Sequence, residues 1–125
     1  MKFKLVENLR FWWPVKVSLP DPDQPGAFVE QQLKVQFVSL PREEQIALDE
    51  AWQSAGRRLR DQDAQERAQL RRICTNWDEV VDDAGDPVAF SAEAFDRALE
   101  LRVFRLAVYR AYAEAMSGQA ARLGN

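Results

Sequence analysis

The sequence contains no histidine and only one cysteine, Cys74. Without histidine the chain cannot build a Ser–His or Cys–His nucleophile pair or a histidine-ligated zinc site, and one cysteine cannot supply a four-cysteine zinc site. A single cysteine also cannot form an internal disulfide, which fits a reducing compartment. We therefore expect no catalytic residue, no metal and no cofactor, and a cytoplasmic location.

Long apolar runs are also missing. The longest, Phe11–Val15, is five residues and includes a proline, whereas a membrane-spanning helix needs about 20 apolar residues. Glu7 and Asn8 occupy the place where the apolar part of a signal peptide would lie. The sequence thus predicts neither a membrane span nor export by a signal peptide.

The chain also lacks a large charge of one sign. Its formal net charge is −3 and its pI is about 5.0, so it has no overall basic excess to attract it to phosphate backbones. We expect no nucleic acid among its partners.

What the chain does contain is enough apolar material for one core. Of its 125 residues, 46% are hydrophobic and 10% aromatic, which is typical of one folded domain of this length. We expect a single α+β domain over residues 1–116. Residues 117–125 are small and polar around two glycines and are expected to form a flexible tail.

Two segments in the first third alternate apolar and polar residues, which predicts a β-hairpin over residues 11–38. The alternation is regular in residues 11–19 and returns in residues 29–37 with a single lapse. Residues 20–26 hold three prolines and a glycine and are expected to be the connecting loop. Because Pro14 has no N–H, the first strand should lie at a sheet edge or turn its unbonded side outward at that position. Met1–Val6 also alternates and is a candidate third strand.

The pattern then becomes helical over residues 41–74. Pro41 is followed by two acids, which favour a helix start. One apolar stripe runs through Leu48, Trp52, Ala55 and Leu59, and a second through Leu70, Ile73, Cys74 and Trp77. We expect a helix from about Pro41 to about Arg58, a polar segment, and a helix resuming to about Cys74, with one unbroken helix as the alternative.

A last helix is predicted over residues 91–116. Ser91 is a suitable N-cap, and Phe90 and Phe95 occupy the two positions of a hydrophobic staple. Its apolar residues fall on two sides, namely Phe95, Leu99, Val103 and Leu106 on one, and Leu101, Phe104, Val108 and Tyr112 on the other. A helix that is apolar over most of its circumference is either central in its domain or covered by another chain.

Charged residues are segregated along the chain. The segment Arg57–Arg72 has six arginines against three acids, a net of +3, whereas Asn76–Glu100 has eight acids against one arginine, a net of −7. The two segments are expected to pair within the chain or between neighbouring chains. The acids at 78, 79, 82, 83 and 86 do not fit the spacing of a calcium loop and are expected to form a solvated turn.

Cys74 falls on an apolar stripe, so we expect it to be a core residue rather than a nucleophile. Trp12 and Trp13 are adjacent on a predicted strand and therefore face opposite sides, so both cannot be buried in one single-layer core. We expect at least one of them to be covered by a helix, a partner chain or a client protein. The candidate protein-binding residues are Trp12, Trp13 and Phe28 on the hairpin, and Leu101, Phe104, Val108 and Tyr112 on the last helix.

Several landmarks together resemble a phage tail assembly chaperone. They are Lys2–Val6, Phe11–Val17 ending in Pro20, Phe28 through Val35–Phe37, Leu40–Pro41, Trp77–Asp82, Gly85–Val88, Phe90–Ser91 and Tyr109–Tyr112. The resemblance extends from about Lys2 to Tyr112. The loop from Asp21 to Pro25 and Trp12 are bulkier than the family pattern.

The resemblance implies a non-catalytic protein of a long, non-contractile-tailed phage or prophage, acting in the bacterial host cytoplasm. Such proteins are thought to coat the tape-measure protein and to help the major tail-tube protein polymerise around it. Because the apolar area of the chain exceeds what one small core should need, we also expect the protein to associate with itself. Three alternatives stay open: a structural component of the tail, a nucleic-acid-binding regulator that uses Arg57–Arg72, and an enzyme that uses carboxylates in a dry pocket.

Overall fold

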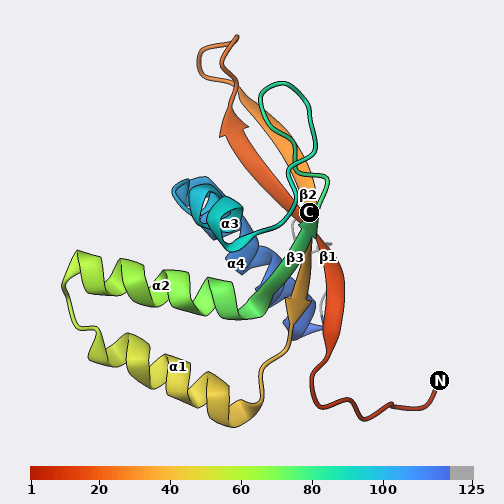
Figure 1. The fold of residues 1–125 in the computed structure, drawn as a ribbon, viewed down its shortest axis with the longest axis vertical. Coiled ribbons are helices and arrows are strands. Elements are labelled where there is room, and N and C mark those ends of the chain that lie inside the picture. Colours follow the sequence, from red (N-terminus) through yellow and green to blue (C-terminus); the bar gives the residue numbers. More distant parts are fainter. Residues whose placement is uncertain (119–125) are drawn as a thin grey trace.

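The computed structural model describes residues 1–118, and it has an α+β fold. The elements along the chain are β1 (Arg10–Pro20), β2 (Phe28–Val38), α1 (Arg42–Ser54), α2 (Leu59–Ile73), β3 (Cys74–Asp78), α3 (Ala92–Ala98) and α4 (Arg102–Ser117). The strands form one antiparallel sheet in the order β1-β2-β3. Figure 1 shows the helices on one side of this sheet and the tip of the β1–β2 hairpin projecting beyond them. Of the expected tail, residues 119–125 lie outside the described part of the chain.

The predicted hairpin is confirmed, and so is the alternation of its faces. Val15 and Val17 face the core and are buried, whereas Trp12 faces away from it. Ser39 donates to the Leu9 carbonyl at 2.8 Å, and Asp21 donates to the Ala27 carbonyl at 2.9 Å. In an antiparallel pair of strands, hydrogen-bonded and non-hydrogen-bonded residue pairs alternate. Leu9 and Asp21 are both hydrogen-bonded, so the odd-numbered residues of β1 bond to β2 and the even-numbered residues point their backbone groups away from it.

Pro14 therefore faces away from β2 and removes no bond from the sheet. It has an even number, so its missing N–H belongs to the outer row of β1. Because β1 is an edge strand, the prediction that proline would be tolerated there is correct. The same row contains the unpaired backbone groups of Trp12, Lys16 and Ser18.

The candidate third strand, Met1–Val6, was wrong, because the third strand of the sheet is β3. Val35 of β2 pairs with Trp77, and Phe37 pairs with Cys74. Residues 1–6 form no strand and are exposed. β3 pairs with β2 and buries Cys74 and Trp77 in the core, whereas the residues before β1 remain exposed.

A β-bulge explains why the sequence pattern predicts a helix that ends at about Cys74 and no strand over Cys74–Asp78. Cys74 and Trp77 are three positions apart, a helical spacing that a regular strand would send to opposite faces. The register shifts between Gln36 and Phe37, so that Thr75 is the additional residue and both side chains reach the core face. Thr75 fixes the bulge by donating from Oγ1 to the Gln36 carbonyl at 3.1 Å.

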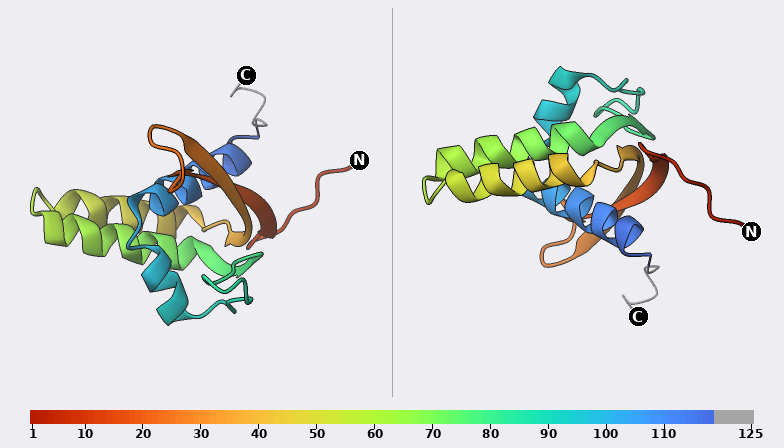
Figure 2. Two further views of the ribbon diagram at one scale, coloured as in Figure 1. Left: turned by 90° about the horizontal axis from the view of Figure 1, so that it is seen from above. Right: turned by 90° about the horizontal axis from the view of Figure 1, so that it is seen from below.

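The helical region 41–74 is broken, but not where the sequence indicated. α1 ends at Ser54, Gly56 adopts a left-handed conformation with φ of 69°, and the polar residues 60–69 lie within the continuous helix α2. Leu59 is consequently exposed rather than part of the α1 stripe. The two helices lie side by side as an antiparallel pair (Figure 2), and Glu44 of α1 accepts two hydrogen bonds from Arg72 of α2.

The predicted helix 91–116 is also divided, into α3 and α4. α3 ends at its C-cap, Leu99, and α4 begins after its N-cap, Leu101, which has an extended conformation. No glycine or proline marks this corner. It allows Phe95 and Leu99 to enter the core from α3, while α4 runs in another direction and packs against β1.

Ser91 begins α3 as predicted. Its Oγ accepts a hydrogen bond from the Ala94 amide at 3.0 Å, and the rings of Phe90 and Phe95 are 5.5 Å apart, as in a hydrophobic staple.

Replacement of Ser91 with alanine should lower the free energy of unfolding by about 1 kcal/mol, because the Ala94 amide loses its partner. Urea unfolding followed by circular dichroism measures this change. Ser91→Asp, which keeps an acceptor, should stay close to the parent protein. Equal stability of the alanine and aspartate variants would contradict the capping role.

Candidate protein-binding surfaces

Three of the seven predicted contact residues are exposed. Trp12 is 45% exposed, Phe28 71% and Leu101 54%. Trp12 and Phe28 share the outer face of the sheet, but they lie near its opposite ends. Trp12 is paired with Gln36, and the distance along β2 from Gln36 to Phe28 is roughly 26 Å at the usual rise per residue. Trp12 and Phe28 therefore do not share one patch, and Leu101 belongs to another element, the corner before α4.

The other four contact residues pack against the protein's own core. Phe104 and Val108 of α4 are buried. Trp13 makes an edge contact with Phe11 at 6.4 Å, and Tyr112 lies 5.3 Å from Phe37. The side of α4 that carries Phe104 and Val108 is therefore apolar because it packs against the protein's own core. Phe104 and Val108 offer no surface to another chain in this structure.

An apolar cleft of about 470 Å³, which we term the loop cleft, opens between the sheet and the chain that follows β3. Its walls come from the inner face of the hairpin, from the loop after β3, and from the corner between α3 and α4. The apolar members are Val17, Leu19, Leu33, Trp77, Val80, Val81, Ala98, Leu101 and Phe104. Leu101 and Val81 are the exposed apolar residues of its rim.

Hydrogen bonds of Trp77 and Val88 hold the loop wall of this cleft in place. The Trp77 indole donates from Nε1 to the Val88 carbonyl at 2.8 Å, and the Val88 amide donates to the Val80 carbonyl at 2.8 Å. Glu79, with φ of 65°, turns the chain out of β3. Trp77 also meets Phe90 edge-on at 5.4 Å, so one side chain joins β3, the loop and the start of α3.

The sequence identified Leu101 as a contact residue but missed Val80 and Val81. The acidic stretch around them predicts only a solvated turn. The two adjacent valines within that stretch were the available sign that part of it packs against apolar residues. Leu101 was assigned to the middle of a helix, whereas its exposure comes from the corner before α4.

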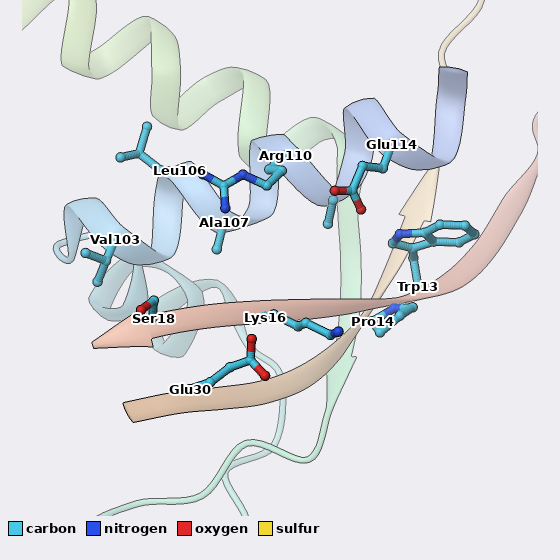
Figure 3. Close-up of a pocket in the computed structure, with 11 residues that line it drawn as sticks. Trp13, Pro14, Lys16, Ser18, Glu30, Val103, Leu106, Ala107, Arg110 and Glu114 are labelled. Carbon is cyan, nitrogen blue, oxygen red and sulfur yellow. The ribbon is translucent and has the colours of Figure 1, made fainter. Parts of the chain in front are cut away.

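A second hollow of about 660 Å³, which we term the edge groove, runs between the outer edge of β1 and α4 (Figure 3). Trp13, Pro14, Lys16 and Ser18 line it from β1. Opposite them, α4 contributes apolar side chains that include the exposed Leu106.

The basic and acidic segments form ion pairs within the chain, which is the first of the two arrangements expected from the sequence. Arg67 contacts Asp63 at 2.9 Å and Glu100 at 3.2 Å, and Arg71 contacts Asp96 at 2.7 Å. The hydrogen bond to Asp63 is the main cause that raises the pKa of the Arg67 guanidinium above its ordinary value. Arginines of α2 are thus engaged with carboxylates of α2 and α3 and of the corner that follows α3.

The acidic segment after β3 forms an exposed turn. The Asp82 carboxylate accepts hydrogen bonds from the amides of Ala84 and Asp86, while Asp83 and Asp86 are exposed. Within residues 1–118, no group of three or more His, Cys, Asp or Glu side chains is placed to hold a metal ion.

Cys74 is a core residue, as predicted. It is buried in β3, and this burial raises the pKa of its thiol. A thiol that resists ionisation is a poor nucleophile.

The comparisons with known proteins add no family to these observations. No family model matches the chain, and no curated protein and no solved structure is significantly similar to it. Among residues 1–118, no helix combines the length and apolar character needed to cross a membrane.

Proposed function

We propose that this chain is a tail assembly chaperone of a long, non-contractile-tailed phage or prophage, acting without catalysis in the cytoplasm of the bacterial host. In this role it binds the tape-measure protein, associates with itself, and promotes polymerisation of the major tail-tube protein. The sequence landmarks from about Lys2 to Tyr112 support the proposal through their resemblance to that family.

The loop cleft is the observation that supports the proposal best. A tape-measure protein is a long helical client, and an amphipathic helix binds by placing spaced apolar side chains in an apolar groove. The loop cleft has the size range of a ligand pocket, and Val81 and Leu101 leave apolar surface at its rim. One such contact is weak, but many copies along one client gain avidity while each remains releasable.

The ion pairs of α2 favour this function over the nucleic-acid alternative. Arg67, Arg71 and Arg72 each contact a carboxylate of the same chain. A phosphate backbone would have to displace those carboxylates, so the segment offers less free positive charge than its net of +3 implies.

A co-expression experiment with a matched pair of leucine variants tests the proposal. The parent protein should keep the tape-measure protein soluble and co-purify with it. Leu101→Glu places a carboxylate at the rim of the loop cleft and should weaken that complex about tenfold or more, because the charge must be desolvated on binding. Biolayer interferometry with a soluble tape-measure fragment measures the affinity.

Leu59→Glu is the control for this experiment. Leu59 is also an exposed leucine, but it starts α2 and does not line the loop cleft. Its variant should bind like the parent. If the tape-measure protein aggregates equally with and without the parent, the proposed chaperone function is contradicted. If both variants lose the same amount of affinity for the fragment, the loop cleft is not the binding site. Mass spectrometry of finished tails should find no copy of this chain, whereas its presence would indicate a structural component.

A further inference from the structure

The first eight residues form an arm that makes no hydrogen bond to the rest of residues 1–118. All eight are exposed, and Leu9, which follows them, is the first residue that bonds to the sheet, through Ser39. Phe3 is 89% exposed and Leu5 85%, and they alternate with Lys2 and Lys4. Figures 1 and 2 show the arm extending away from the domain. An extended segment with alternating apolar residues is suited to join a sheet.

The outer edge of β1 is a place where a strand can be added. The backbone groups of Trp12, Lys16 and Ser18 point away from β2, and within residues 1–118 no other segment bonds to them. Pro14 removes one donor from this row but leaves its carbonyl. An incoming strand thus finds an almost complete row of donors and acceptors.

The edge groove gives such a strand an apolar wall on one side. Side chains of an added strand that point toward the helical layer would meet Val103 and Leu106 of α4, and Leu106 is half exposed. The charges around the groove balance: Lys16 and Arg110 are basic, Glu30 and Glu114 are acidic, and none of the four forms an ion pair within residues 1–118 (Figure 3). Backbone pairing and apolar contact, rather than net charge, would therefore supply the affinity.

We propose that residues 1–6 of one copy add as a strand to the outer edge of β1 in a second copy, within the edge groove. Phe3 and Leu5 then face Val103 and Leu106, while Lys2 and Lys4 face solvent. Six extended residues span about 17–20 Å, which matches the roughly 20 Å from Trp12 to Ser18. This inference rests on the self-association that is part of the proposed function, and it specifies how that association occurs.

The arm is poorly placed to fill its own edge. Folding back onto β1 needs a tight turn at Glu7 and Asn8, and two-residue hairpin turns require φ above zero. Among residues 1–118, Glu79 and four glycines are the ones with positive φ. Even with such a turn, pairing would run Leu5 opposite Arg10 and Met1 opposite Pro14, so the arm would never reach Lys16 or Ser18. A second copy's arm has no such tether.

Two kinds of variant test the exchange, one for the arm and one for the edge. Phe3→Ser with Leu5→Ser removes the apolar residues of the arm, which are exposed and not needed for the fold. Lys16→Pro removes one outward N–H from the edge, as Pro14 already does, and Lys16→Thr is its control because it keeps the N–H. Sedimentation velocity over a wide range of concentration should show self-association of the parent and of Lys16→Thr, and its loss in the other two variants.

Mixing the two defective variants gives the decisive measurement. The arm variant keeps an intact edge and the Lys16→Pro variant keeps an intact arm, so together they should form a one-to-one complex that neither forms alone. Added salt should change the affinity less than twofold, since the groove charges balance. Association of the arm variant at the parent's affinity, absence of the mixed complex, or a parent that is monomeric at every concentration would overturn the inference.

Failure of the exchange and failure of the chaperone function can be told apart. Binding of the tape-measure fragment is measured separately, with the Leu101→Glu and Leu59→Glu pair. An arm variant that is monomeric yet binds the fragment through the loop cleft supports both proposals. A parent that binds the fragment but never self-associates overturns the strand exchange and leaves client binding in place.

Discussion

Replacement of Phe95 with alanine should lower the free energy of unfolding by about 3–5 kcal/mol. Phe95 is 1% exposed, and its ring lies 6.1 Å from Trp77, 5.5 Å from Phe90 and 6.1 Å from Phe104. These partners come from β3, from the residue before the Ser91 cap and from α4, so the cavity left behind has rigid walls on several sides. Since small domains are stable by only about 5–15 kcal/mol, this one change should bring the protein close to unfolding at ordinary temperature.

Urea unfolding of Phe95→Ala and Phe3→Ala, followed by circular dichroism, measures the difference. Phe3 is the matched control, because it is exposed and makes no ring contact in the described structure. Its variant should differ from the parent by less than about 0.5 kcal/mol. A loss below about 1 kcal/mol in Phe95→Ala would mean that the ring cluster around α3 is not packed as the structure has it.

Trp77 should show the second large effect, in two separable parts. Trp77→Ala removes a buried aromatic ring and should cost about 3–5 kcal/mol. Trp77→Phe keeps most of the apolar surface but removes the indole donor, which leaves the Val88 carbonyl without its 2.8 Å partner. The expected cost of that single loss is about 1–2 kcal/mol.

The phenylalanine variant also tests whether Trp77 holds the wall of the loop cleft. Hydrogen exchange at the Val88 amide, which bonds to the Val80 carbonyl, should become faster in Trp77→Phe. Trp12→Phe is the control, since Trp12 is exposed and its indole makes no hydrogen bond within residues 1–118. Unchanged stability and unchanged exchange in Trp77→Phe would contradict the anchoring role. Faster exchange with weaker client binding would connect the loop to the proposed function.

Much of the local structure could be predicted because its signals are local. Alternation predicts the two strands of the hairpin, and the three prolines predict its loop. Pro14 predicts that its position has no neighbouring strand to bond to, which the outer edge of β1 confirms. The start of α3 followed from Ser91 and its two flanking phenylalanines. In each case the deciding interaction joins residues that are close along the chain, so a short window contains the information.

The helix breaks show two different degrees of predictability. Gly56 is a local signal for the end of a helix, and it was overlooked because Leu59 happens to continue the apolar period of α1. The corner at Leu99–Leu101 has no such signal. It forms because α3 must point Phe95 and Leu99 into the core while α4 must run along β1. These two orientations are set by contacts between elements and not by the local sequence.

The candidate binding residues separate in the same way. Counting apolar residues on the last helix could not distinguish Leu101, which is exposed at the corner, from Phe104 and Val108, which are buried. A helix presents an apolar stripe identically whether its own sheet or a partner covers it. The loop cleft and the edge groove were equally invisible, because each is formed by segments far apart in the sequence.

The sequence by itself determined the α+β class, the hairpin, the cap of α3 and the core position of Cys74, since these depend on residue type and short spacing. Only the tertiary structure decided that β3 rather than Met1–Val6 completes the sheet. Pairing of Val35 with Trp77 and of Phe37 with Cys74 joins residues about forty positions apart, and its gain is the burial of both side chains in a shared core. No local pattern records that gain, and the arm it leaves unpaired is the segment that we propose to bind a second copy.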